Sequence, residues 1–278
     1  MSGNYTASVM IWLGFLAVPI LGAYLFQNSL LYHPDNYSLT QLAQQVKDSP
    51  VKPWPTANEA YRGLIASPHT TDIRGTIVVF HGNAGSAYDR LYYVRALEPL
   101  GYRVLLAEYP RYGARPGSLG EQSLVADAIA TARATREAFP GPFYVWGESL
   151  GCAVATGVAA EESLAVDGLV LITPWKNLPD LAQSIYWFLP AKWLVKDRYD
   201  NASNLNKFKS PVALLMADRD EIIPNRQTLA LYELIRAPKR LWVFKNAGHN
   251  SWPISPQENW WYEVTSFTGG AQINKPEQ

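Results

Sequence analysis

The stretch Gly147-Glu148-Ser149-Leu150-Gly151 organises the chain. It follows the apolar run 143–146 (FYVW) and precedes the small-residue run 152–160 (CAVATGVAA), an order that predicts a strand, a sharp turn and a helix. In that setting the G-x-S-x-G pattern indicates a nucleophile elbow, in which the serine sits on a strained turn and side chains at the glycine positions would collide with the adjacent strand and helix. Ser149 is therefore the candidate nucleophile. The rest of the chain must supply a base, an acid and an oxyanion hole.

Composition excludes several classes of function. The 278 residues contain 24 Lys and Arg against 24 Asp and Glu, and no basic tract occurs, so nothing in the charge favours a nucleic-acid partner. The single cysteine excludes an internal disulfide framework. With only 4 histidines and no H-E-x-x-H spacing, we expect neither a metal nor another cofactor.

The N-terminus carries an uncharged apolar run, VMIWLGFLAVPILGAYLF, at 9–26. Its length suits a bilayer core of roughly 30 Å, and Trp12 and Tyr24 lie near its ends, where aromatic residues favour the membrane interface. A cleaved signal peptide would need basic residues and a small-residue cleavage site, and a buried core helix would carry a polar face. We therefore predict a single-pass membrane anchor within 1–27. Its orientation stays open, because Lys47 is the first Lys or Arg.

Strand-like and helix-like segments alternate along the rest of the chain. Expected strands lie at 60–66, 75–80, 103–107, 143–146, 167–173, 211–217 and 241–244, and expected helices at 39–46, 88–100, 119–139, 152–160 and 256–267. The alternation predicts an α/β fold with a mostly parallel sheet flanked by helices on both faces. We divide the remainder into a connecting segment (28–59), one α/β domain (60–269) and a tail (270–278).

Residues 174–209 interrupt the alternation with an aromatic-rich insertion. It lies beyond the carboxyl edge of the predicted sheet, where open α/β sheets bind ligands. We expect a small helical lid with an apolar underside, and Trp175 and Trp187 are candidate substrate contacts. The alternative is that its aromatic residues only pack the insertion onto the body of the domain.

The remaining catalytic candidates also follow predicted strands. The glycine-containing turn 81–86 (HGNAGS) comes directly after one strand and offers free backbone N–H groups, the donors that an oxyanion hole requires. Acidic residues at 218–220 follow the next-to-last strand, and His249 follows the last. The order serine, acid, histidine is the order of the catalytic triad in α/β-hydrolases.

On these residues the chain resembles an α/β-hydrolase over roughly 60–267. Four shorter pieces resemble the Bem46-like group, which includes the ABHD13 and ABHD17 branches: the turn 81–86, the loop 109–117, the stretch 193–200, and an N-terminal anchor followed by 31–34 (LYHP). The resemblance implies a membrane-anchored serine hydrolase that cleaves a carboxylic ester or thioester through an acyl-enzyme. Members of the ABHD17 branch include protein depalmitoylases, a substrate class that the resemblance permits and does not select.

The resemblance also assigns roles at the site. It places the acid four residues before Pro224, at Asp220, with Asp218 as the alternative. The backbone N–H groups of Asn83 and Leu150 are the expected oxyanion donors. Two rival functions stay open: a serine peptidase that uses the same triad, and a binding protein on a hydrolase fold that has no catalytic activity.

Four further polar residues have more ordinary expected roles. His81 is expected to shape the oxyanion turn, Cys152 to pack inside the following helix, and Asp127 to be structural. Glu148 is expected to contact solvent or the lid.

Overall fold

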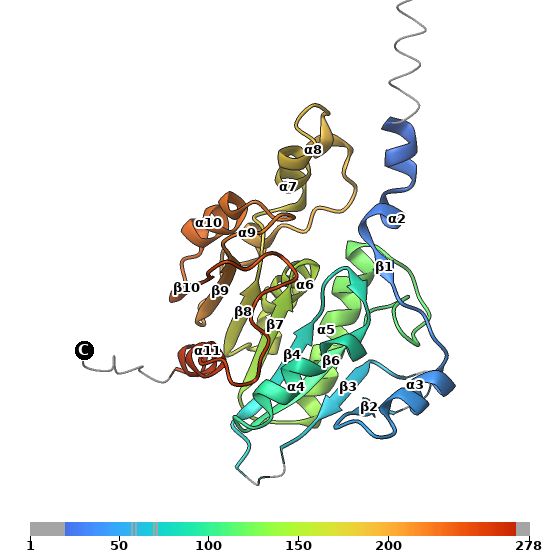
Figure 1. The fold of residues 1–278 in the computed structure, drawn as a ribbon, viewed down its shortest axis with the longest axis vertical. Helices are drawn as coiled ribbons and strands as arrows, with labels where there is room; N and C mark the ends of the chain where they lie inside the picture. The colour runs from blue at the N-terminus through green and yellow to red at the C-terminus, as the bar shows by residue number, and fades with distance from the viewer. Residues whose placement is uncertain (1–19, 57, 59, 69, 71, 271–278) are drawn as a thin grey trace, which may run out of the picture.

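The computed structural model describes residues 20–56, 58, 60–68, 70 and 72–270 (Figure 1). A single eight-stranded sheet forms the centre of the described part, in the spatial order β10-β9-β8-β7-β4-β6-β3-β2. Its strands are β2 (Lys52–Trp54), β3 (Gly63–Ala66), β4 (Gly75–Phe80), β6 (Tyr102–Ala107), β7 (Phe143–Glu148), β8 (Gly168–Ile172), β9 (Val212–Ala217) and β10 (Lys239–Phe244). Neighbouring strands from β10 to β6 pair in parallel, and β3 pairs antiparallel with both β6 and β2.

The central strands are continuous apolar runs because both faces of the sheet are covered. All six residues of β4, GTIVVF, are buried. Val78 and Phe80 pack into the core on one face, and Ile77 and Val79 into the core on the other. Because the strands from β10 to β6 run parallel, their carboxyl ends lie at one edge of the sheet.

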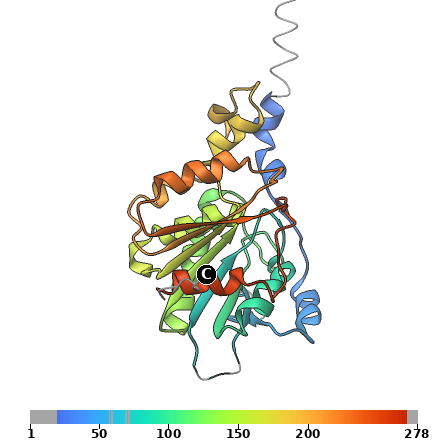
Figure 2. The same cartoon turned by 60° about the vertical axis from the view of Figure 1, so that its left-hand side comes forward.

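Helices form a layer on each face (Figures 1 and 2). One layer consists of α5 (Glu121–Ala138), α6 (Leu150–Ala159) and α10 (Asn225–Leu234), and the other of α3 (Leu39–Val46), α4 (Leu91–Leu97) and α11 (Trp260–Thr268). The short 3-10 helices η1 (Ala87–Arg90) and η2 (Glu162–Leu164) complete the helical elements of the body. The predicted mostly parallel α/β architecture is confirmed.

The insertion between β8 and β9 contains α7 (Leu178–Ile185), α8 (Ala191–Leu194) and α9 (Asn201–Asn204). The side chain of Asn177 caps α7, and that of Asp200 caps α9, each by accepting a backbone N–H. Both views place α7 and α8 beyond the carboxyl edge of the sheet and beside the N-terminal helix (Figures 1 and 2). The insertion is helical, as expected, whereas its role as a lid stays a prediction.

The N-terminal part that the structure describes begins with helical residues 20–25 and continues through α2 (Gln27–Leu31) to β1 (His33–Pro34). Strand β1 pairs in parallel with β5 (Ala84–Gly85). Within the described ranges, no helix combines the length and apolar character needed to cross a membrane. Most of the predicted anchor, 1–19, lies outside the described residues, as does nearly all of the predicted tail, 271–278.

Strand β2 and helix α10 are among the regular elements that have no counterpart in the expected ones. Strand β2 lies inside 28–59, so the segment that we expected to be a connection also supplies an edge strand of the sheet. Helix α10 follows β9. Helix α11 begins at Trp260 and not at Pro256, because 255–258 form a turn closed by the Glu258 N–H and the Ser255 carbonyl oxygen.

Candidate active site

Ser149 lies in a sharp turn between β7 and α6. Its backbone angles, φ 50° and ψ −118°, fall in a region that residues with a side chain rarely adopt. The flanking glycines make the turn possible: a Cβ on Gly147 would lie 2.3 Å from the carbonyl oxygen of Gly151, and one on Gly151 would lie 2.0 Å from that of Phe80. The collisions expected at both glycine positions are therefore present.

The structure brings Ser149, His249 and Asp220 together in a line of hydrogen bonds. The Oγ atom of Ser149 lies 3.0 Å from Nε2 of His249, and Nδ1 of His249 lies 2.8 Å from Oδ2 of Asp220. His249 is 6% exposed, and Asp220 is almost completely buried. With Nδ1–H donating to the carboxylate, the lone pair of Nε2 faces the serine hydroxyl.

The partner of His249 is Asp220 and not Asp218. The second oxygen of Asp220, Oδ1, accepts the backbone N–H groups of Ile222 (2.9 Å) and Ile223 (2.7 Å), which fix the carboxylate. Glu221 was missed by the sequence reasoning. Its Oε2 atom accepts the backbone N–H of His249 at 3.0 Å and so holds the loop that carries the imidazole.

The turn after β4 lies against the serine. A Cβ on Gly82 would be 3.7 Å from the Cβ of Ser149, so the backbone at Gly82 and Asn83 borders the nucleophile. Leu150 is the first residue of α6, where a backbone N–H has no partner within its own helix. The two expected oxyanion donors thus belong to segments that adjoin Ser149, and their role stays a prediction.

The N-terminal segment holds this turn in place. The carbonyl oxygen of Asn83 accepts the backbone N–H of His33 (2.8 Å) and the hydroxyl of Tyr112 (2.7 Å), while the Asn83 side chain donates to the carbonyl oxygen of Leu31 (2.7 Å). Asp35 N–H donates to the carbonyl oxygen of Gly85 at 3.0 Å. The contacts of Leu31, His33 and Asp35 join residues about 50 positions apart, and no local sequence pattern indicates them.

His81 is buried beneath the turn and does not face the site. Its Nε2 lies 3.1 Å from Oε1 of Glu108, and its Nδ1 lies 2.8 Å from the carbonyl oxygen of Gly82. Glu108 also accepts the backbone N–H of Ala87 at 3.1 Å. This geometry agrees with a shaping role for His81.

Glu148 is not the solvent or insertion contact that we expected; it faces the interior of the domain. Its carboxylate is mostly buried and accepts bonds from Nε of Arg90 (2.7 Å), from the hydroxyls of Tyr92 and Tyr93, and from the backbone N–H of Gly82 (3.4 Å). Burial opposes the charged form, but the Arg90 guanidinium and the Tyr92 hydroxyl outweigh it, so the pKa of Glu148 lies below its usual range. A charged Glu148 therefore ties the elbow to the turn at Gly82.

The other expected residues are not part of the hydrogen-bonded line of Ser149, His249 and Asp220. Cys152 is fully buried, and burial raises the pKa of its thiol well above the usual value, in keeping with a packing role. Trp175 is 3% exposed and belongs to the core, whereas Trp187 is 79% exposed at the tip of the insertion. Substrate contact by either tryptophan stays a prediction.

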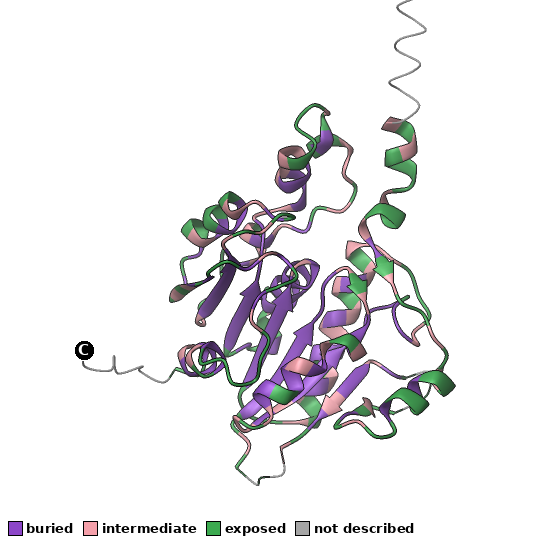
Figure 3. Cartoon of the chain, viewed as in Figure 1, coloured by how far each residue is buried: buried purple, intermediate pink, exposed green. Residues whose placement is uncertain are grey.

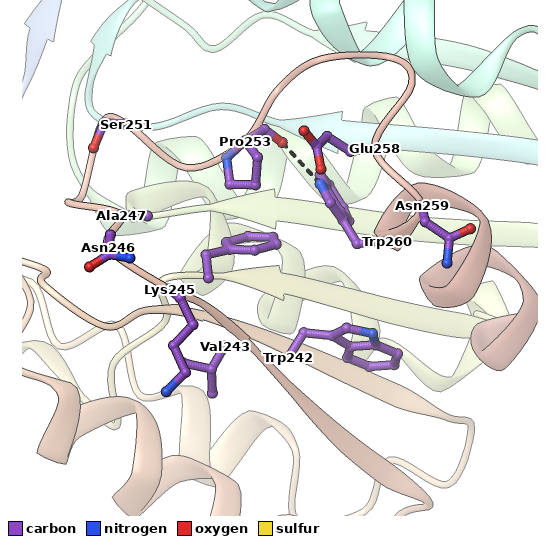
Figure 4. A pocket seen from close by; sticks show the side chains of 11 residues that line it. Trp242, Val243, Lys245, Asn246, Ala247, Ser251, Pro253, Glu258, Asn259 and Trp260 are labelled. Atoms are coloured by element: carbon purple, nitrogen blue, oxygen red, sulfur yellow. Dashed lines mark hydrogen bonds between the residues drawn. The ribbon is translucent and has the colours of Figure 1, made fainter. Parts of the chain in front are cut away.

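A hollow of about 400 Å³ lies between the end of β10, the loop that follows it and the start of α11. Figure 4 shows the side chains that line it. Residues that line it include Trp242, Ser251 and Trp260, whose Nε1–H donates to the carbonyl oxygen of Pro253. Its lining contains none of the side chains Ser149, Asp220 and His249, so it is separate from the candidate active site. In the described part of the chain, no cluster of three or more His, Cys, Asp or Glu side chains is placed to hold a metal ion.

Comparisons with known proteins agree with this fold. A family model described as the alpha/beta hydrolase fold matches residues 75–207. The esterase Pf2001 of Pyrococcus furiosus superposes with a TM-score of 0.61 at 18% identity, covering 85% of this chain and 97% of that one.

Two relatives are similar in sequence. An uncharacterised protein of Mycobacterium tuberculosis is 35% identical over 187 residues, which cover 66% of each chain. The lysophosphatidylserine lipase ABHD12 of Danio rerio is 30% identical over 184 residues, which cover 59% of this chain and 48% of the lipase. The matched region thus spans about two thirds of the first relative and about half of the second.

The buried pair of Glu148 and Arg90 leads to a stability prediction. Glu148→Gln keeps the side chain's shape but leaves the guanidinium without its counter-charge, which typically costs about 3 kcal/mol or more. We expect the thermal unfolding midpoint, measured by differential scanning fluorimetry, to fall by on the order of 6–12 °C. Glu161→Gln is the matched control, because its pair with Arg133 is exposed and contributes little.

A double variant separates pairing from general damage. If the two side chains act as a pair, Glu148→Gln combined with Arg90→Gln lowers the midpoint by less than the sum of the single effects. Simple additivity would mean that the two charges stabilise the fold independently.

Proposed function

The chain belongs to the α/β-hydrolase superfamily, and on that premise we propose that it is a serine hydrolase that cleaves a carboxylic ester or thioester through an acyl-enzyme. One observation carries the proposal: the continuous hydrogen-bonded line from Ser149 through His249 to Asp220. This line has the geometry that nucleophilic catalysis by a hydroxyl requires, because a serine is a poor nucleophile until a base removes its proton.

The proposed reaction has two halves. In the first, Oγ of Ser149 attacks the carbonyl carbon while Nε2 of His249 takes the hydroxyl proton; collapse of the tetrahedral intermediate breaks the bond to the leaving oxygen or sulfur, which receives that proton. In the second, His249 deprotonates a water that attacks the acyl-enzyme, and Ser149 recovers a proton as the acid departs. Asp220 holds the imidazole tautomer and stabilises the imidazolium.

The negative charge of each tetrahedral intermediate needs hydrogen-bond donors. We assign that role to the backbone N–H groups of Asn83 and Leu150. The buried carboxylates of Glu148 and Glu108 support the assignment, since each accepts a backbone N–H of the turn and limits its movement. Donors that are fixed before the reaction need no reorganisation as charge develops, and the loss of one typically costs about 10²–10³ in rate.

Lipid-linked esters are the proposed substrate class. The zebrafish relative is named a lysophosphatidylserine lipase, and the apolar run at 9–26 would place this enzyme at a membrane. An acylated protein is the alternative source of the same acyl chemistry. The insertion at 174–209 would then act as a lid beside the carboxyl edge of the sheet.

The first test is covalent labelling of the nucleophile. We expect a fluorophosphonate probe to label the wild-type protein and to leave Ser149→Ala unlabelled, with ester turnover falling by at least about 10³-fold. Ser163→Ala is the control, because Ser163 is an exposed serine on η2. An unlabelled wild-type protein would support the rival view of a binding protein without catalytic activity.

The second test separates an esterase from a peptidase. We expect p-nitrophenyl esters to be hydrolysed, with kcat/KM rising along a series of acyl chain lengths, because each buried CH₂ group adds about 0.8 kcal/mol of binding. Peptide amides should be turned over far more slowly under the same conditions. Turnover of the amides without turnover of the esters would establish the peptidase instead.

The third test concerns the anchor. Deleting 1–26 removes the apolar run and keeps Gln27, whose side chain bonds to Leu194 and Lys196. We expect the full chain to stay in the membrane pellet after an alkaline carbonate wash and the deletion variant to be released. A deletion variant that resists the wash would show that another segment spans the membrane.

A further inference from the structure

The tip of the insertion, residues 185–193, exposes an unusual set of large side chains. Four are Ile185 (43% exposed), Trp187 (79%), Phe188 (65%) and Trp193 (78%). They form part of the green outer end of the insertion in Figure 3, whereas the sheet below is buried. Exposed apolar surface gathered in one place marks an interaction site more often than scattered single residues do.

Polar contacts hold the tip in this outward conformation. Helix α7 buries Leu178 and Leu181 in the body, so its C-terminal end projects. The side chain of Gln183 then closes the following loop: its Nε2 donates to the carbonyl oxygen of Leu189 at 2.8 Å, and its Oε1 accepts the backbone N–H of Lys192 at 3.4 Å. The exposed aromatic side chains therefore lie on a loop whose conformation is fixed by hydrogen bonds from Gln183.

The tip is also fixed beside the end of the apolar N-terminal run. Gln27, directly after that run, donates to the carbonyl oxygen of Leu194 (2.9 Å) and accepts the backbone N–H of Lys196 (2.9 Å). The side-chain hydroxyl of Tyr32 donates to Asp197. Leu25 (59%) and Phe26 (65%) are likewise exposed on this neighbouring helical segment. The N-terminal helical segment and the insertion thus lie next to each other at one end of the molecule, and each carries exposed apolar side chains (Figures 1 and 2).

The charges around the tip complement an anionic surface. Two exposed lysines, Lys192 and Lys196, lie on and directly after the tip. Lys192 Nζ lies 5.2 Å from the ring centre of Trp193, and Lys196 Nζ lies 4.4 Å from that of Tyr24. Tryptophan and tyrosine beside lysine is the combination that suits the boundary between lipid headgroups and acyl chains.

We propose that the tip of the insertion docks into the surface of a lipid bilayer, next to the N-terminal anchor. Phe188 and Trp193 enter the boundary below the headgroups, and Lys192 and Lys196 contact lipid phosphates. This inference rests on the proposed function for its membrane-bound substrate. It adds a second attachment, which would set the carboxyl edge of the sheet, and with it Ser149, at the bilayer surface. The exposure of Trp187 then suits lipid contact better than substrate contact.

A fluorescent label tests the docking without catalysis. Phe188→Cys in the full chain provides a selective attachment point for an NBD dye, because the native Cys152 is buried. Tyr262→Cys is the matched control: Tyr262 is also an exposed aromatic (54%), and it lies on α11, at the other end of the domain. Both proteins would be reconstituted into vesicles of phosphatidylcholine with a minority of phosphatidylglycerol.

We expect the dye at position 188 to shift its emission to the blue and to be quenched by nitroxide-labelled lipids, while the dye at 262 stays unquenched and unshifted. Equal behaviour at both positions would overturn the proposal. A second outcome would also overturn it: a blue shift at 188 that grows with protein concentration in detergent, together with no quenching by nitroxide-labelled lipids in vesicles. That result would show that a second copy of the chain covers the tip.

Activity provides an independent measurement. Replacing both Phe188 and Trp193 by Ser removes two aromatic contacts with the bilayer. Burial of one aromatic side chain changes the partitioning of the protein between water and membrane by about tenfold. We expect turnover of a long-chain ester embedded in vesicles to fall by at least about tenfold and turnover of a soluble short-chain ester to stay unchanged. Equal loss on both substrates would contradict docking, and no turnover of either by wild-type protein would instead refute the proposed function.

Discussion

The close approach of α6 to β4 is the constraint on which the rest of the site depends. A Cβ at Gly151 would lie only 2.0 Å from the carbonyl oxygen of Phe80, so the first turn of α6 can pass β4 this closely only if position 151 has no side chain. The chain must then turn within one residue, and Ser149 takes a positive φ of 50°. Because β7, β9 and β10 run parallel, the side chains that follow them meet at one edge. The strained turn raises Ser149 to that edge, within reach of His249.

Two buried carboxylates determine the shape of the turn beside the serine. Glu148 accepts the backbone N–H of Gly82 at one end, and Glu108 accepts that of Ala87 at the other. Each carboxyl group has a side-chain partner: Nε of Arg90 lies 2.7 Å from Oε1 of Glu148, and Nε2 of His81 lies 3.1 Å from Oε1 of Glu108. Arg90 continues the network by donating to the carbonyl oxygen of Ala84 at 3.1 Å. The turn is thus held from both ends by hydrogen bonds to buried carboxyl groups, which suits donors that have to be in place before a reaction begins.

The features that the sequence predicts are those that depend on neighbouring residues. The features that it does not predict depend on residues far apart along the chain. Buried parallel strands such as β4 are recognisable from their continuous apolar composition. The elbow is recognisable from the G-x-S-x-G pattern between a strand and a helix. The short edge strand β2, with Pro53 at its centre, has neither the apolar run of a buried strand nor a recognisable motif. It forms by pairing with β3 at the edge of the sheet. Glu148 shows the same limit: its partner Arg90 lies 58 positions away, so no local pattern indicates a buried carboxylate at this position.

The pairing of His33 with Ala84 belongs to this long-range class, and it changes how the N-terminal segment should be understood. A linker would leave its backbone solvated, yet the segment from Gln27 to Asp35 bonds first to the insertion and then to the turn at Asn83. Main-chain hydrogen bonds to an otherwise irregular turn restrict it as a neighbouring strand would. One continuous stretch of chain therefore joins the apolar N-terminal run, the exposed tip of the insertion and the wall beside Ser149. Fewer than ten residues, from Gln27 to Asp35, make all of these contacts, so the end of the apolar run and the turn beside Ser149 are held by the same short segment.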